Sequence, residues 1–220
     1  MSSQRVRGIV KGLAGNRAFR SWRDLPPGFV TESAALSDDE VIDLVARLWR
    51  LREHRFLHAG AIALHGHPTS LRKVRWNVLE PLGNQMDGWG AVDQFALLAG
   101  PAWREGRLSD ARVLRWTRSP NRWWRRAALV CTVVLNRRSL GGEGDTRRTL
   151  MVCEPLAGDR DDMVAKAMSW ALRDLIAHDR RAVERFLRRH DARLPALVKR
   201  EVRNKLTTGV KNPSRSRRPS

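Results

Sequence analysis

A tryptophan and an aspartate lie four residues apart in the segment Asp87-Gly-Trp-Gly-Ala-Val-Asp93. The apolar residues that follow predict a helix with Asp87 as its N-cap, and this spacing places Trp89 and Asp93 on one helix face. An indole ring attracts a cation through its quadrupole, and a carboxylate attracts it by charge. The pair therefore predicts a site that holds a cation. The structural alternative is a Trp89 packed in the core and an Asp93 that caps the helix or pairs with an arginine.

A second segment, Trp123-Trp124-Arg125-Arg126, begins a predicted helix over residues 122–136. If Trp124 is buried, the helical period places Arg126 beside Trp123 on a neighbouring face. Guanidinium groups in that position can hold phosphate through paired hydrogen bonds. A solvated arginine pair at a helix start is the alternative.

A third segment runs from Lys166 to Arg173, with Trp170 and Arg173 one helical turn apart. This segment, like the other two, places polar or aromatic groups on a face that the core does not use, although a stack of arginine on indole is a sufficient structural reason for the spacing.

Metal and disulfide chemistry are not indicated elsewhere in the chain. His65 and His67 stand in a Gly/Pro turn with no further ligands nearby, which predicts a solvated turn. Cys131 and Cys153 each lie within an apolar stretch, so we expect reduced thiols in the core.

The charge balance indicates a polyanionic partner. The 220 residues contain 42 Lys and Arg against 23 Asp and Glu, a net charge of +19. Nucleic acid is the commonest intracellular polyanion. No apolar run approaches the roughly 18 residues of a membrane span, and the start lacks the apolar region of a signal peptide. We expect a soluble, intracellular protein without membrane contact.

Helical periodicity recurs along the whole chain, with no convincing alternating strand. Ser37-Asp-Asp-Glu40 forms a capping box for the helix that follows it. Further helices are expected over about 53–65, 69–82, 87–100, 110–116, 122–136, 146–156, 162–176, 180–190 and 194–206. These antiparallel pairs with short loops predict an all-α solenoid of two-helix units, with an irregular helical bundle as the alternative. We expect one domain over residues 1–206 and a disordered basic tail over 207–220.

Together the three segments resemble the AlkD-like DNA alkylation repair family, the HEAT-like-repeat alkylpurine DNA glycosylases. "GWGAVD" matches the family's W-x-x-x-D element through Trp89 and Asp93. "WWRRAAL" matches its W-x-x-R-A-A element and makes Arg126 the site arginine. "KAMSWALR" matches the element that contains Trp170 and Arg173. The resemblance covers roughly residues 41–210.

The resemblance implies a solenoid of HEAT-like repeats whose concave, basic face binds duplex DNA containing alkylated purines and excises the base without the usual flipping. The implied catalytic residues are Asp93, Trp89 and Trp170. The implied DNA-binding residues are Arg126, Arg173, Arg125, Trp123 and Lys166. We expect a cytoplasmic, nucleoid-associated monomer.

The chemistry agrees with that expectation. An N3- or N7-alkylated purine is already cationic, so its glycosidic bond breaks with little acid catalysis, and positive charge moves to the sugar. Asp93, Trp89 and Trp170 could stabilise that charge, and one carboxylate suffices without metal or cofactor.

Two other functions remain open. A non-catalytic protein that binds DNA, including branched DNA, would need only the basic face, and a helical scaffold would need no nucleic acid. The family usually has a longer N-terminal region with a polar residue that approaches the lesion. This chain begins close to that point, so we expect that the first repeat is shortened or that the start codon is misassigned.

Overall fold

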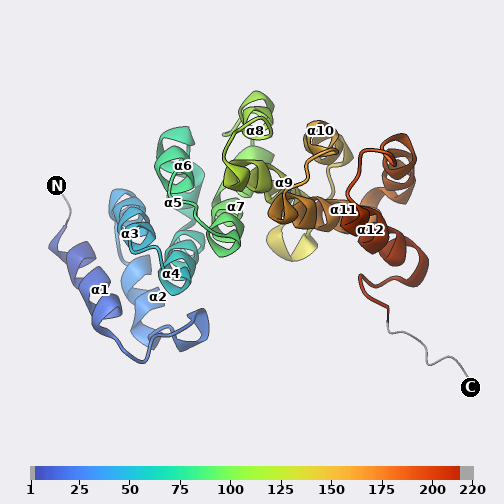
Figure 1. The fold of residues 1–220 in the computed structure, drawn as a ribbon. Coiled ribbons are helices and arrows are strands. Elements are labelled where there is room, and N and C mark those ends of the chain that lie inside the picture. The colour runs from blue at the N-terminus through green and yellow to red at the C-terminus, as the bar shows by residue number, and fades with distance from the viewer. Residues whose placement is uncertain (1–2, 214–220) are drawn as a thin grey trace, which may run out of the picture. The chain divides into compact units, whose positions relative to one another are not determined.

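The computed structural model describes residues 3–213, and every regular element in that range is a helix (Figure 1). The predicted all-α class is therefore confirmed. The contacts divide the chain into two compact units, Met1–Leu108 and Ser109–Ser220, each of which is described by itself. The single domain over residues 1–206 stays a prediction. No helix within residues 3–213 is long and apolar enough to cross a membrane.

The N-terminal unit is built from seven α-helices and one short 3₁₀ helix among its described residues (Figure 1). These are α1 (Gln4–Gly15), η1 (Trp22–Asp24), α2 (Pro27–Ala34), α3 (Asp38–Arg50), α4 (His54–His65), α5 (Pro68–Lys73), α6 (Trp76–Gly83) and α7 (Trp89–Arg104). Helix α3 packs against α1 and α4, and α4 packs in turn against α7. Each helix thus buries its apolar face on its neighbours, as in a helical repeat solenoid.

The start of α3 shows how local sequence sets a helix. Ser37 Oγ accepts the backbone N–H of Glu40 at 3.4 Å, and the Glu40 carboxylate accepts the N–H of Ser37 at 2.9 Å. The predicted capping box is confirmed. The following turns bury an apolar stripe that consists of Val41, Leu44, Val45, Leu48 and Trp49.

Two predicted boundaries in this unit are wrong. The helix expected over residues 69–82 is two helices, because Arg75 adopts an extended backbone (φ −131°, ψ −180°) between α5 and α6. The N-cap of α7 is Gly88 (φ −158°, ψ 165°), and no side chain caps this helix. Asp87 lies one residue outside the cap position, so its predicted capping role is also wrong.

Helix α7 also continues beyond its expected end at Gly100-Pro101. Pro101 has no N–H, so the carbonyl of Leu97 loses its helical donor. His65 Nε2 lies 3.1 Å from that carbonyl oxygen and replaces the missing bond. His67 Nε2 similarly lies 2.9 Å from Leu36 O. The two histidines therefore hold backbone carbonyls. His65 and Gly66 are exposed, as expected of a solvated turn, whereas His67 is half-buried.

The C-terminal unit contains five α-helices and a second 3₁₀ helix among its described residues (Figure 1). These are α8 (Asp110–Trp116), α9 (Arg122–Asn136), η2 (Arg138–Leu140), α10 (Thr146–Leu156), α11 (Asp162–Arg189) and α12 (Ala196–Thr208). Helix α11 is central, because it packs against α9, α10 and α12. Cys131 and Cys153 are free and buried, as predicted, and burial raises the pKa of both thiols.

The buried amide of Asn136 joins three segments of the C-terminal unit. Its Nδ2 donates to Thr132 O and to Thr149 Oγ1, both at 2.9 Å. Its Oδ1 accepts the backbone N–H of Asp145 at 2.9 Å. The end of α9, the loop that follows it and the start of α10 are thereby fixed to one another.

Two glycines allow that loop to lie close against the helices. A Cβ at Gly142 would come within 2.5 Å of Leu135 O, and a Cβ at Gly144 (φ +97°) would meet the His178 ring at the same distance. Any larger residue would therefore push the loop outward.

Helix α11 bends at Asp179, whose backbone is not helical (φ −146°, ψ 77°). The separate helix predicted from residue 180 corresponds to the segment after this bend. At the other end of the unit, α12 continues to Thr208 and ends at Gly209 (φ +77°), so the tail begins later than expected. Residues 214–220 of the predicted tail lie outside the described residues.

The bend gives the first prediction. Asp179 Oδ1 accepts the N–H of Ala182 at 2.9 Å and so caps the second segment of α11. We expect Asp179→Ala to lower the free energy of unfolding by about 1 kcal/mol, because a half-buried helix start loses its cap. Asp179→Asn keeps an acceptor and should lose much less. Urea denaturation of the three proteins measures both effects, and equal losses in the two variants would contradict the capping role.

Candidate nucleic-acid site

Trp89 is the first residue of α7, and its side chain is 57% exposed. Asp93 follows one turn later on the same helix and is half-buried. The structure thus presents the predicted indole and carboxylate on one helix face of the N-terminal unit. Trp89 is not a core residue, in contrast to Trp49 and Trp103, which are at most 1% exposed.

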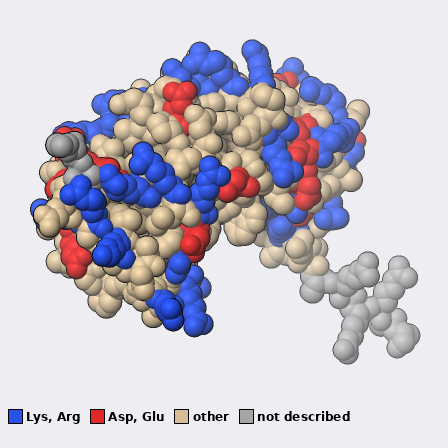
Figure 2. All heavy atoms as spheres, turned by 60° about the vertical axis from the view of Figure 1, so that its left-hand side comes forward, with Lys and Arg blue, Asp and Glu red and all other residues tan. Residues whose placement is uncertain are grey.

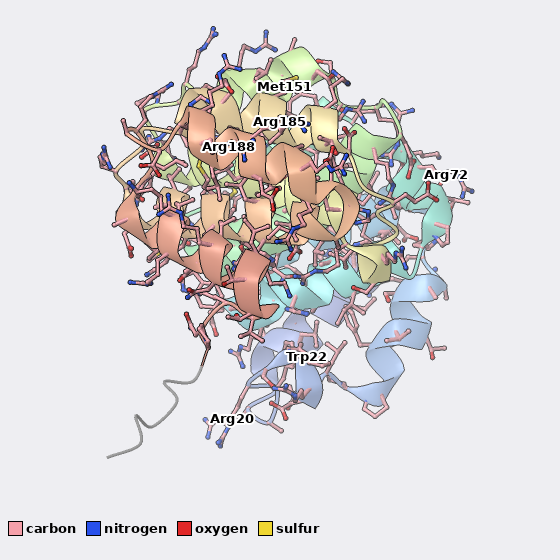
Figure 3. All side chains as sticks on the ribbon, turned by 90° about the vertical axis from the view of Figure 1, so that its right-hand side faces the viewer. Arg20, Trp22, Arg72, Met151, Arg185 and Arg188 are labelled. Atoms are coloured by element: carbon pink, nitrogen blue, oxygen red, sulfur yellow. The ribbon has the colours of Figure 1, made fainter. Side chains whose placement is uncertain are left out.

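The Trp89 ring belongs to a row of four aromatic rings. Its centre lies 6.2 Å from that of His54, which lies 5.6 Å from that of His58. His58 stacks on Trp22 at 5.7 Å with only 14° between the ring planes. The row therefore links η1, α4 and α7, and Trp22 at its far end lies at the edge of the unit with Arg20 (Figure 3).

The histidines of this row were not predicted as site residues. Their spacing of four in His54-Arg-Phe-Leu-His58 was a local signal, because it places both rings on one face of a helix. Burial, followed by repulsion from His54, lowers the pKa of His58. His58 Nδ1 is buried without a hydrogen-bond partner within residues 3–213, which also favours the neutral ring.

Gly90 is required for the contact between α4 and α7 at this point. A Cβ on Gly90 would lie 2.5 Å from His54 Cδ2, whereas a Cβ on Gly88 would meet no atom within 4 Å. The small residue at position 90 therefore allows the His54 ring to lie over the start of α7.

In the C-terminal unit, the predicted arginines of α9 are bonded within the protein. Arg126 is only 5% exposed, and its Nη1 donates to Met163 O at 2.9 Å. Arg125 Nε donates to Asp159 Oδ2 at 2.7 Å, and its Nη1 donates to Ser119 O at 2.9 Å. Both side chains thus hold helix ends together. Their binding to DNA stays a prediction.

The tryptophans at the start of α9 differ in their partners. Trp124 is half-buried and lies 5.0 Å from the buried Trp116, ring centre to ring centre. Trp123 is half-buried, and the guanidinium of Arg122 lies 4.7 Å from its ring centre. Trp123 therefore carries a cation on one face, a contact that the sequence did not predict.

Trp170 on α11 is half-buried and also carries an arginine over its ring. The arginine is Arg137, 5.2 Å from the ring centre, which in turn pairs with Asp174 at 2.9 Å. Arg173 instead turns to Ser169, whose Oγ lies 3.2 Å from Arg173 Nε. No local pattern pointed to Arg137, because it lies more than thirty residues from Trp170 in the sequence.

A buried acid lies behind Arg173. Ser169 Oγ donates to Glu201 Oε2 at 2.6 Å, and Glu201 is only 4% exposed. Burial lowers the pKa of Arg173, while the charges of Glu201 and Asp174 act in the opposite direction. Lys166, one turn before Trp170, is exposed and pairs with Asp162 at 2.6 Å.

Lysines and arginines are spread over the surface visible in Figure 2, with acidic residues among them. The predicted concave basic face stays a prediction. Residues 3–213 contain no group of three or more His, Cys, Asp or Glu side chains placed to hold a metal ion.

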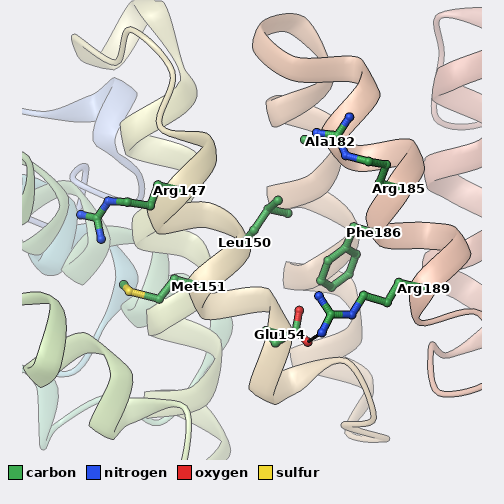
Figure 4. Close-up of a pocket in the computed structure, with 8 residues that line it drawn as sticks. All are labelled: Arg147, Leu150, Met151, Glu154, Ala182, Arg185, Phe186 and Arg189. Atoms are coloured by element: carbon green, nitrogen blue, oxygen red, sulfur yellow. Dashed lines mark ion pairs between the residues drawn. The ribbon is translucent and has the colours of Figure 1, made fainter.

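A pocket of about 500 Å³ lies between α10 and the second segment of α11 (Figure 4). Leu150, Met151 and Phe186 line it together with arginines. Its acid, Glu154, pairs with Arg189 at 3.6 Å and with the buried His190 at 3.0 Å. None of the predicted site residues lines this pocket.

Comparison with known proteins gives one match. A family model described as DNA alkylation repair enzyme matches residues 28–206, which confirms the resemblance inferred from the three sequence segments. No curated protein and no solved structure gives a significant match.

The contact at Gly90 leads to a prediction. We expect Gly90→Ala to displace the His54 ring from Trp89 with little loss of stability, because an exposed ring can rotate away. NMR chemical shifts of the His54 ring protons, which depend on the neighbouring indole, measure the displacement. Gly88→Ala is the matched control and should leave these shifts unchanged. If Gly90→Ala leaves them unchanged as well, the steric role of Gly90 is disproved.

The lowered pKa of His58 leads to a second prediction. The ordinary pKa of 6.5 applies to the unfolded chain, and the folded value is lower, so protonation favours unfolding. The free energy of unfolding should therefore fall as the pH decreases from 7 to 5. His58→Gln removes this titration and should show a shallower decrease. Parallel stability curves for the two proteins would show that His58 has no shifted pKa.

Proposed function

Because this chain belongs to the family of DNA alkylation repair enzymes, we propose that it hydrolyses the N-glycosidic bond of cationic N3- or N7-alkylated purines in duplex DNA. The observation that carries the proposal is the exposed indole of Trp89 with the carboxylate of Asp93 one turn further along α7. An indole face and a carboxylate together suit a substrate that carries positive charge.

The chemistry requires stabilisation of a cation more than acid catalysis. An alkylated purine that is already cationic leaves as a neutral base, and the deoxyribose takes up positive charge as the bond breaks. Asp93 stabilises that charge and positions the attacking water, while Trp89 contributes the negative face of its ring. Enzymes that cleave uncharged glycosides use a second carboxyl group to protonate the leaving group, and this substrate does not need one.

The C-terminal unit contributes Trp170 and the arginines around it. Trp170 presents an indole face that suits a sugar carrying positive charge, and Arg137 and Arg173 supply positive charge for phosphates of the DNA. Arg126 and Arg125 act chiefly by fixing the start of α9, because they are more buried than Arg137 and are bonded to protein groups. Trp123 and Lys166 contact the backbone of the DNA.

The alkylated base stays in the duplex during the reaction. Trp89 supports this part of the proposal, because it stands on the surface of the unit and not within an enclosed cavity. An exposed ring can approach the sugar of a stacked nucleotide from outside, whereas an enzyme that flips its base needs a pocket deep enough to hold it.

The carboxylate is tested by Asp93→Asn. We expect release of methylated purines from N-methylpurine-containing duplex DNA to fall about 100-fold or more, because the charge that stabilises the sugar cation is lost. Binding of the same DNA should remain, or become tighter, since a negative charge near phosphate has been removed.

Glu80→Gln is the matched control. Glu80 is an exposed acid of α6 in the same unit, so this change removes one negative charge without touching α7. It should leave excision unchanged. If the wild-type protein binds alkylated DNA and releases no base, the chain is a DNA-binding relative that lacks the chemistry. If the wild-type protein binds DNA only at low salt, neither the glycosylase nor the DNA-binding relative is supported. The alternative of a helical scaffold without a nucleic-acid role then replaces them.

A further inference from the structure

A second pocket lies beside Trp89, on the side where α4 begins. It has a volume of about 400 Å³, and its walls are the rings of Trp89 and His54. Leu57 and Ala91 lie buried at its base, and the exposed Arg52 and Asp87 stand on its rim. We name it the Arg52 pocket. Asp93 does not line it, so it is separate from the carboxylate of the proposed reaction.

The exposed indole of Trp89 forms one wall of the pocket. Among the described residues only one other tryptophan is exposed, Trp22 at the far end of the ring row. Contact with His54 fixes the indole from one side. A Cβ on Gly88 would meet no atom within 4 Å, so the space on that side of the indole is open, whereas the His54 ring fills the space at Gly90. A flat aromatic face held in this way is a stacking surface for another planar ring.

Arg52 is the second distinctive feature. It joins α3 to α4 with φ +56°, and it is the one non-glycine residue with positive φ within residues 3–213. Glycine would adopt this conformation without strain, so the arginine is kept at an energetic cost. Its side chain makes no ion pair or hydrogen bond within the described residues. An exposed, unpaired guanidinium on the rim of an aromatic pocket suits a phosphate group.

We propose that the Arg52 pocket binds one unstacked nucleotide of DNA, with its base against the indole of Trp89 and its phosphate paired with Arg52. Asp87 orients the nucleotide, because its carboxylate repels phosphate and accepts an N–H from the base. This inference rests on the DNA binding that the proposed function requires. The unstacked nucleotide is a different one from the alkylated nucleotide, which stays in the duplex. The inference adds a preference for DNA in which a nucleotide near the contact is unpaired.

An unpaired nucleotide is required because the bases of an intact duplex are covered on both faces by their neighbours. A nucleotide in a single-base bulge is already free to leave the stack. The pocket should therefore make the protein bind a bulged duplex more tightly than a perfect one. A basic surface alone does not produce this difference, because both duplexes present a similar charged backbone.

The test compares two duplexes that contain 2-aminopurine, a base whose fluorescence is quenched by stacking. In one duplex it forms a single-nucleotide bulge, and in the other it is paired with thymine. For the wild-type protein we expect tighter binding of the bulged duplex and quenching of the bulged base on binding. Trp89→Leu should abolish the additional quenching, because the stacking surface is removed.

Arg52→Gly tests the guanidinium and the strained backbone together. The ratio of bulged to paired affinity should fall about tenfold, as expected for the loss of one charge-assisted contact. The melting temperature should not fall, because glycine adopts a positive φ without strain. Arg72→Ala removes an exposed arginine elsewhere in the unit and should leave the affinity ratio unchanged.

Equal affinities for the two duplexes, or an unchanged ratio in Arg52→Gly, would overturn the proposal. Excision of methylated purines is measured on the same protein preparations. Excision without a bulge preference would reject the pocket and leave the glycosylase proposal intact. A bulge preference without excision would reject the glycosylase proposal and leave the pocket.

Discussion

The second residue of α7 can carry no side chain while the His54 ring keeps its place, and the geometry of the N-terminal site depends on this steric limit. Gly90 lets the His54 ring reach the position that a Cβ would occupy. His54 in turn supports Trp89 and contacts His58, whose other neighbour is Trp22. The absence of a Cβ at Gly90 thus allows the aromatic rings of η1, α4 and α7 to contact one another, and the indole of Trp89 stays exposed.

Several arginines of the C-terminal unit hold its helix ends together. A guanidinium offers five donors, so a single side chain can bond a carboxylate and several carbonyl groups at once. Arg125 does so by joining α9 to the turn before it and to Asp159, which lies between α10 and α11, and Arg126 reaches the backbone at Met163. Part of the net charge of +19 is therefore used to join helix ends, and the charge available to DNA is smaller than the composition suggests.

Local patterns in the sequence predicted the helices well where the cause of the structure is local. The capping box at Ser37 and the apolar stripe of α3 lie within one stretch of chain, so α3 was predicted correctly. The end of α7 was predicted wrongly, because the hydrogen bond to Leu97 O that replaces the one lost at Pro101 comes from His65, about thirty residues earlier. Only tertiary structure shows such a replacement partner.

The candidate site, like the helices, was predicted only where the arrangement depends on neighbouring residues in the sequence. Trp89 and Asp93 share a face through helical spacing alone, and the spacing was visible in the sequence. The partner of Trp170 was not, because Arg137 reaches it from another helix. The pairing of Trp22 with His58 has the same cause, since residues far apart in the chain meet only after folding.

The loop after α9 would be judged a weak point from its composition, since Gly141-Gly-Glu-Gly144 has the appearance of a flexible linker. Proteases cut such segments when the backbone can leave the surface and enter their active site. Here Asn136 holds the residue that follows the loop, and Gly142 and Gly144 lie against neighbouring groups with no space for a Cβ. This glycine-rich segment should therefore resist limited proteolysis, because it is held firmly between α9 and α10.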